Sequence, residues 1–176
     1  MKKTSFICIA VLCIFASCKK SNSSSGYHVT ATIDGTTQSF NVSPVAVALN
    51  DSGYQQITIV GLSSTSSIAG SLGVTWSNNV TTQGFGVATY TDTATSYAIT
   101  GDYIPNMTSS YVSGSGMVMT AANSNVSIAN HLKLVITAVD STHIKGTFSG
   151  DFYFSGDITG AIKTVTNGDF DVPWKK

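Results

Sequence analysis

Apolar and polar residues alternate along most of the chain from residue 27 onward. The stretch 27–33 places an aromatic or aliphatic side chain at every second position, with His or Thr between them. The same period of two returns at 132–138 and 144–154. A period of two is typical of strands that bury one face and expose the other. Repeated runs with turn residues between them predict about ten short antiparallel strands.

Turn residues divide these runs. Asp34-Gly35 and Asn167-Gly168 both stand between apolar alternations, which is the strongest local signal for a β-hairpin. We therefore expect a hairpin at each, with the second closing the chain. The segment 101–115 is the least regular, and Met117–Ala121 reads as a further strand. No run with the period of a helix is visible, so the pattern predicts a single all-β domain.

Composition narrows the fold class further. The chain contains no Arg and no Glu, while Ser and Thr together account for 48 of its 176 residues. Helices use Glu, Arg and Lys on their solvent faces, whereas β-branched Thr favours strands. We expect an antiparallel β-sandwich, with a closed lipocalin-like barrel as the alternative. The absence of Arg also argues against nucleic-acid binding, which needs a basic surface.

The first eighteen residues form an export signal. Lys2 and Lys3 precede an apolar stretch, 6–16, that is too short to span the ~30 Å core of a bilayer as a lasting helix. Phe15-Ala16-Ser17-Cys18 then resembles the bacterial lipoprotein box, in which small residues precede a Cys. The resemblance implies that residues 1–17 are a signal peptide and that Cys18 is lipidated, carrying thioether-linked diacylglycerol and a fatty acid such as palmitate.

The sequence divides the mature chain into a tether, 18–26, and a body, 27–176. The tether is rich in Ser and carries Lys19 and Lys20, which suits a flexible linker beside anionic lipids. Cys8, Cys13 and Cys18 all lie before the body, so we expect no disulfide in it. From residue 26 onward five Lys stand against nine Asp, a net charge of −4.

Three short stretches resemble a family of Bacteroidota lipoproteins of unknown function. They are Ala31-Thr32-Ile33-Asp34-Gly35, the run Ile144-Lys145-Gly146-Thr147-Phe148-Ser149-Gly150, and the ending Val165-Thr166-Asn167-Gly168-Asp169-Phe170-Asp171-Val172-Pro173. The resemblance implies an all-β outer-membrane lipoprotein and brings no catalytic residues with it. The tether has no acidic residue after Cys18, which favours a periplasm-facing position over display on the cell surface.

Catalytic residues are hard to assign from the sequence. His28 and His131 occupy polar positions of predicted strands and His143 lies in a turn, so we expect all three to be solvated. A small hydrolase using Asp151 and Asp157 is the enzymatic alternative, since paired carboxylates cleave glycosides when they face each other across a cleft. We do not expect an enzyme.

Exposed aromatic residues are the candidates for ligand binding. Tyr103 and Tyr111 flank the irregular segment, and Tyr153 has the opposite parity to its apolar neighbours, so each is expected to face solvent and stack on a sugar ring. Outward positions and a turn explain Asn167, Asp169 and Asp171, although their oxygens leave Ca²⁺ binding open. We expect no metal or other cofactor.

Two further positions resemble the O-glycosylation motif of Bacteroidota, in which Thr or Ser follows Asp. They are Thr93 and Ser141, both in predicted turns.

The sequence as a whole predicts a non-catalytic envelope lipoprotein, held at the outer membrane by Cys18, that binds a glycan or an envelope protein. The alternatives are the Asp-dependent hydrolase and a barrel that carries an apolar ligand.

Overall fold

The computed structural model describes residues 26–51, 53–64, 70–78, 84–123, 127–155 and 157–175. The predicted signal peptide, Cys18 and the tether up to residue 25 lie outside these residues. Eleven strands and one helix are described: β1 His28–Ile33, β2 Thr36–Ser39, β3 Val42–Asp51, β4 Tyr54–Leu62, β5 Ser71–Asn78, β6 Ala88–Thr91, β7 Ala98–Asn106, β8 Ser109–Gly114, α1 Ser115–Asn123, β9 Lys133–Val139, β10 His143–Phe154 and β11 Ile162–Lys175.

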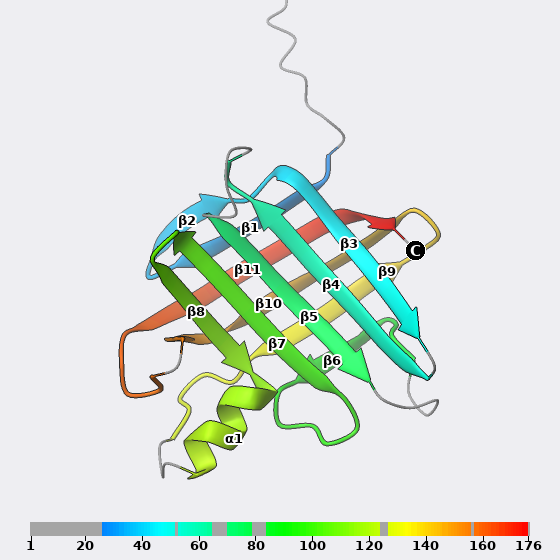
Figure 1. Cartoon of the computed structure of the whole chain (residues 1–176). Helices are drawn as coiled ribbons and strands as arrows, with labels where there is room; N and C mark the ends of the chain where they lie inside the picture. The colour runs from blue at the N-terminus through cyan, green and yellow to red at the C-terminus, as the bar shows by residue number, and fades with distance from the viewer. Residues whose placement is uncertain are drawn as a thin grey trace, which may run out of the picture.

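The strands form two layers (Figure 1). The front sheet contains β3, β4, β5, β7 and β8, and the back sheet contains β2, β1, β11, β10, β9 and β6. The strands of the two layers cross at a steep angle in Figure 1. The predicted all-β fold is therefore confirmed.

Hydrogen bonds join the two layers at opposite corners. The end of β11 pairs in parallel with β3 at Trp174 and Ala46. The end of β10 pairs with β8 at Tyr153 and Val112. Because β10 and β11 also pair with each other, the ladder closes through β11, β3, β4, β5, β7, β8 and β10. The fold combines the layers of a sandwich with the closed circuit of a barrel.

The inward side chains of both layers form one hydrophobic core. Strand β5 alternates strictly between buried and half-buried positions, as the period of two requires. The largest fully buried side chains are Trp76, Tyr90, Phe40, Phe152, Phe170, Ile57, Leu72, Ile99, Leu132, Leu134, Ile136 and Ile144. They come from both sheets, so side chains fill the space between the layers.

The two predicted hairpins have different outcomes. Asp34 and Gly35 both have positive φ and join β1 to β2, as expected. The hairpin predicted at Asn167-Gly168 is wrong, because both residues lie inside the continuous strand β11. Asn167 adopts φ of 48°, and the register of β11 slips by one residue against both β1 and β10. Asn accepts the left-handed region readily, so here it forms a β-bulge.

The segment 101–123 also differs from expectation. Strands β7 and β8 form a hairpin across the stretch expected to be irregular. Residues 115–123 then form α1 where Met117–Ala121 was expected to be a strand. The spacing of four residues between Met117 and Ala121 places both on the side of the helix that packs against Tyr153 and Ile158. In the part of the chain that the structure describes, no helix has the length and apolar character needed to cross a membrane.

Candidate functional site

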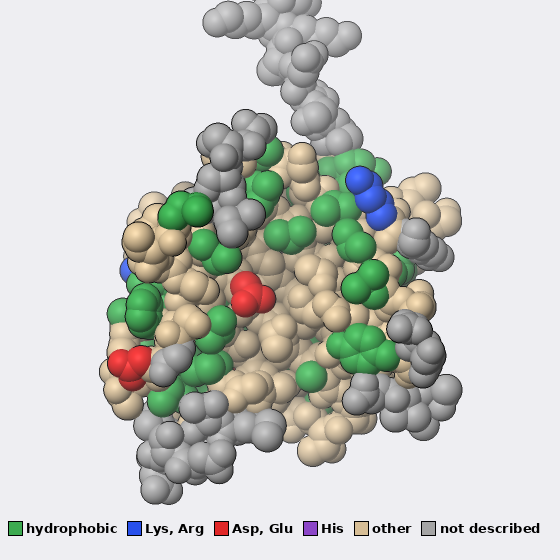
Figure 2. Space-filling view, viewed as in Figure 1, with side chains coloured by type: hydrophobic (Ala, Val, Ile, Leu, Met, Phe, Trp, Pro, Cys, Tyr) green, Lys and Arg blue, Asp and Glu red, His purple; other side chains and the backbone are tan. Residues whose placement is uncertain are grey.

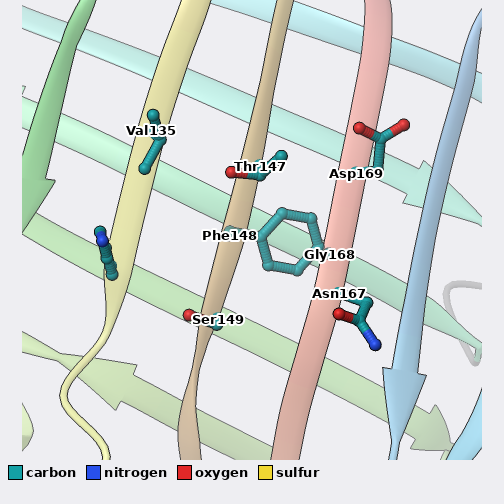
Figure 3. A pocket seen from close by; sticks show the side chains of 8 residues that line it. Val135, Thr147, Phe148, Ser149, Asn167, Gly168 and Asp169 are labelled. Carbon is teal, nitrogen blue, oxygen red and sulfur yellow. The ribbon is translucent and has the colours of Figure 1, made fainter.

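A hollow of about 440 Å³ opens on the outer face of the back sheet (Figure 3). Three neighbouring strands, β9, β10 and β11, provide its walls. Figure 3 shows side chains standing on these strands around the ring of Phe148. The lining residues are Lys133, Val135, Thr147, Phe148, Ser149, Asn167, Gly168 and Asp169. The volume falls within the range of small-molecule sites, roughly 300–1,000 Å³.

The hollow exists because β11 carries a glycine beside a bulge. Gly168 pairs with Phe148 across the ladder, and a Cβ at Gly168 would lie only 2.4 Å from the Phe148 carbonyl oxygen and 2.7 Å from its ring. Position 168 therefore has no room for a side chain, and only glycine fits there. The bulge at Asn167 leaves Asn167 and Asp169 both exposed on either side of the buried Gly168. Two polar side chains thus border a position that has no side chain.

The lining offers both hydrogen-bond donors and acceptors. Lys133 forms no ion pair with any described carboxylate, so its ammonium group is available to a ligand. His28 Nε2 lies 2.5 Å from Asp169 Oδ2 and fixes the orientation of that carboxylate. The hydrogen bond to Asp169 raises the pKa of His28, against the opposing effect of burial. Hydroxyl groups of Thr147 and Ser149 complete a polar rim.

Two of the three residues considered for Ca²⁺, Asp169 and Asp171, are paired with basic side chains, whereas Asn167 lines the hollow. Asp169 contacts His28, and Asp171 Oδ2 lies 2.7 Å from Lys145 Nζ. The hydrogen bond to Asp171 raises the pKa of Lys145. Among the described residues no cluster of three His, Cys, Asp or Glu side chains is placed to hold a metal ion. Asp169 and Asp171 therefore belong to pairs of oppositely charged or titratable side chains on the outer side of the back sheet.

The expected exposure of three tyrosines is wrong. Tyr103 and Tyr111 belong to the main core and retain 5% and 8% of their accessible surface, and Tyr153 retains 3%. Tyr153 does point away from the main core, as its parity indicated, but α1 covers it. Burial raises the pKa of Tyr153, with the nearby Asp151 and Asp92 carboxylates adding to the effect. None of the three rings is open to stacking by a ligand.

The two carboxylates of the hydrolase alternative have separate environments. Asp151 is buried and accepts hydrogen bonds from Asn130 and Thr164. Asp157 is exposed and accepts hydrogen bonds from the hydroxyl and backbone N–H of Thr159, which lower its pKa. Within the described part of the chain they share no hydrogen-bond partner, and the local structure accounts for each carboxylate.

Each histidine is paired with an aspartate, which the sequence did not indicate. His28 pairs with Asp169 and His143 with Asp140. His131 Nδ1 lies 2.8 Å from Oδ1 of Asp92, whose side chain is only 1% exposed, while 43% of the His131 side chain is exposed. Asp92 Oδ2 also accepts a hydrogen bond from the backbone N–H of Leu132. Asp92 thus fastens the turn after β6 to the start of β9.

The two positions that resemble O-glycosylation sites are both exposed. Thr93 follows the buried Asp92, whereas Ser141 follows the exposed Asp140. Hydrogen bonds from Thr142 and His143 lower the pKa of Asp140 to about 2. Modification of Thr93 and Ser141 stays a prediction.

Comparison with known proteins provides no assignment for this hollow or for the fold. The chain matches no protein-family model, no curated protein and no solved structure.

Proposed function

We propose that this protein is a non-catalytic envelope lipoprotein that binds a neutral sugar in the hollow of its back sheet. Lipid on Cys18 would hold it at the outer membrane, facing the periplasm. The observation that carries the binding proposal is the hollow itself, in which Lys133, Ser149 and Asp169 come together from three different strands. The export signal supports the location, and no contact to nucleic acid is proposed.

The chemistry of the lining suits hydroxyl groups. A sugar hydroxyl both donates and accepts, so it pairs with an ammonium group, a carboxylate, an amide or another hydroxyl. Lys133 supplies a donor, Asp169 an acceptor, and Ser149 and Asn167 both kinds of group. Val135 gives one apolar wall for the ring hydrogens of the sugar. Because no exposed aromatic ring lines the hollow, we expect weak binding of one sugar unit, with a Kd of about 1 mM.

Amide chemical shifts test the site directly. We expect neutral hexoses and N-acetylhexosamines to shift the amide signals of Val135, Thr147, Ser149 and Asn167 during an NMR titration. Lys133→Ala removes the unpaired donor and should weaken binding about fivefold to tenfold, the loss of roughly 1 kcal/mol from one solvent-exposed hydrogen bond. Lys145→Ala is the matched control, since it removes the same charge from the neighbouring strand outside the hollow. Shifts confined to another surface, or equal effects of the two variants, would contradict the proposal.

The membrane anchor is tested separately. Cys18→Ala removes the thiol that lipidation requires, so we expect the variant to leave the membrane fraction or to accumulate with its signal peptide uncleaved. Fractionation of cells and mass measurement of the N-terminal peptide report both outcomes. A Cys18→Ala variant that fractionates and is processed like the wild type would refute the anchor while leaving sugar binding in the hollow unaffected.

A further inference from the structure

The two outer faces of the molecule differ sharply in charge. The back sheet presents His28, Lys133, Lys145, Asp169 and Asp171 on its outer side. The outward side of the front sheet, here called the neutral face, consists of the alternate residues 45–49 of β3, 56–62 of β4, 71–77 of β5 and 98–104 of β7. Among these described positions Asp102 is the only charged residue. Figure 2 shows this face, with hydrophobic side chains around a polar centre that contains one acidic group.

Large and small side chains on the neutral face are sorted by strand. Strand β3 presents Leu49, Val47 and Val45, all branched aliphatic residues. Strand β5 presents Ser77, Thr75 and Gly73 at the same three levels, two strands away. Strand β4 lies between them. The face therefore has an aliphatic ridge on one side of β4 and a shallow groove on the other.

This arrangement is complementary to itself. A two-fold axis running along β4, in the plane between two copies, places β3 of each copy over β5 of the other. Val47 would then pack over Thr75 and Val45 over Gly73, reciprocally on both sides of the axis. Val60 on β4 would pack against its own counterpart. Such matching of one patch with itself is what a two-fold interface requires.

The charges follow the same symmetry. Lys175 pairs with Val47 at the end of β11 and extends the neutral face by one strand beyond β3. Asp102 lies on β7, two strands beyond β4 on the opposite side. The same axis therefore places Asp102 of one copy over β11 of the other. There it lies two residues along the strand direction from Lys175. The long side chain of Lys175 covers that offset of roughly 7 Å.

The Asp102 side chain is exposed on the neutral face and is therefore accessible to a second copy. Within the described residues it has no hydrogen bond and no ion pair, and the surrounding protein raises its pKa by desolvation. With the end of β11 included, the neutral face spans about 24 Å across five strands and, over the seven residues that β4, β5 and β7 contribute, roughly 24 Å along them. Two such faces would bury on the order of 1,100 Å² in total, the size of a weak, reversible interface.

We propose that the neutral face is a homodimer interface, in which β3 of each copy packs over β5 of the other and Asp102 pairs with Lys175 across it. Sheets that stack in this way lie about 10 Å apart. The hollow lies on the opposite sheet, so a dimer would keep both hollows open and facing outward. Two sites on one particle raise the apparent affinity for a polysaccharide without any new contact.

Charge reversal tests the proposed pairing. The mature lipoprotein in mild detergent is examined by density-matched sedimentation equilibrium. We expect a dimer for the wild type and at least a tenfold weaker association for Asp102→Lys or Lys175→Asp, because each creates two like-charge contacts. The double variant D102K/K175D restores opposite charges and should recover the wild-type dissociation constant to within about threefold. The control Thr137→Lys adds a charge to the exposed outer side of β9 and should leave association unchanged.

The same measurements can refute the dimer and the Asp102–Lys175 pair separately. A wild-type chain that remains monomeric at 100 µM, roughly the concentration at which an interface of this size should be populated, would overturn the proposal. Single variants that dimerise like the wild type, or a double variant that stays monomeric while melting at the wild-type temperature, would overturn the Asp102–Lys175 pairing. Binding of a sugar by a monomeric chain would show that the hollow acts alone.

Discussion

Replacing Asp151 by Ala should lower the free energy of unfolding by about 3 kcal/mol, because it removes a buried carboxylate that accepts hydrogen bonds from two other segments of the chain. Asp151 is 3% exposed. Its Oδ2 accepts a hydrogen bond from the backbone N–H of Asn130 at 3.2 Å, and Asn130 Nδ2 donates to both carboxylate oxygens at 3.1 and 3.0 Å. Thr164 Oγ1 donates to Oδ1 at 2.9 Å. One side chain thus holds β10, β11 and the segment before β9 together.

Asp157→Ala is the matched control for this prediction. Asp157 is exposed, and among the described residues its side chain bonds only within its own turn. We expect its removal to cost less than about 1 kcal/mol. Urea unfolding monitored by fluorescence gives both values from the shift in midpoint at constant slope. Equal losses for the two variants would show that Asp151 is not the structural link described. Asp151→Asn, which keeps one acceptor oxygen, should lie between them.

Asp151 also affects the hollow, because it holds the segment that leads into Lys133. Asn130 precedes Lys133 by three residues, and Asp92 holds the intervening Leu132 through its backbone N–H. Two buried carboxylates therefore fix the segment from which Lys133 projects. Asp151→Ala should weaken sugar binding as well as stability, whereas Asp157→Ala should affect neither.

The strands that the alternation predicts most clearly are those whose faces differ most in burial. In 132–138 the apolar positions Leu132, Leu134 and Ile136 are all buried in the core. Asp34-Gly35 was also predictable, since a two-residue turn depends only on local backbone conformation. These features need no information from distant parts of the chain.

The features that the sequence did not indicate depend on tertiary contacts. Asn167 can adopt the same left-handed conformation in a turn and in a bulge. The bulge forms because β11 pairs with β1 on one side and with β10 on the other. Likewise Met117 and Ala121 fit a strand or a helix, and the presence of Tyr153 beneath them favours α1. The hollow has the same origin. Lys133, Ser149 and Asn167 are neighbours only because three strands align in register.

Replacing Trp76 by Ala should cost about 4 kcal/mol, the range observed for large aromatic residues in a filled core. Trp76 is fully buried, and its ring centroid lies 5.4 Å from Phe85, 5.8 Å from Tyr90 and 6.4 Å from Tyr97. The indole N–H has no hydrogen-bond partner among the described residues, so packing alone makes the contribution. Trp76→Phe, which keeps most of the apolar volume and removes the unpaired donor, should therefore cost only about 1 kcal/mol.

The adjacent Thr75 provides the control, because it occupies the opposite side of the same strand. Its hydroxyl lies 3.1 Å from that of Thr58 on the partly exposed outer face, and Thr75→Ala should cost less than about 1 kcal/mol. The contrast between positions 75 and 76 also separates a filled core from a barrel that carries an apolar ligand. In a carrier, Trp76 would border empty space and its truncation would cost little. Chemical denaturation of the three variants decides this, and a loss below about 1.5 kcal/mol for Trp76→Ala would favour the carrier.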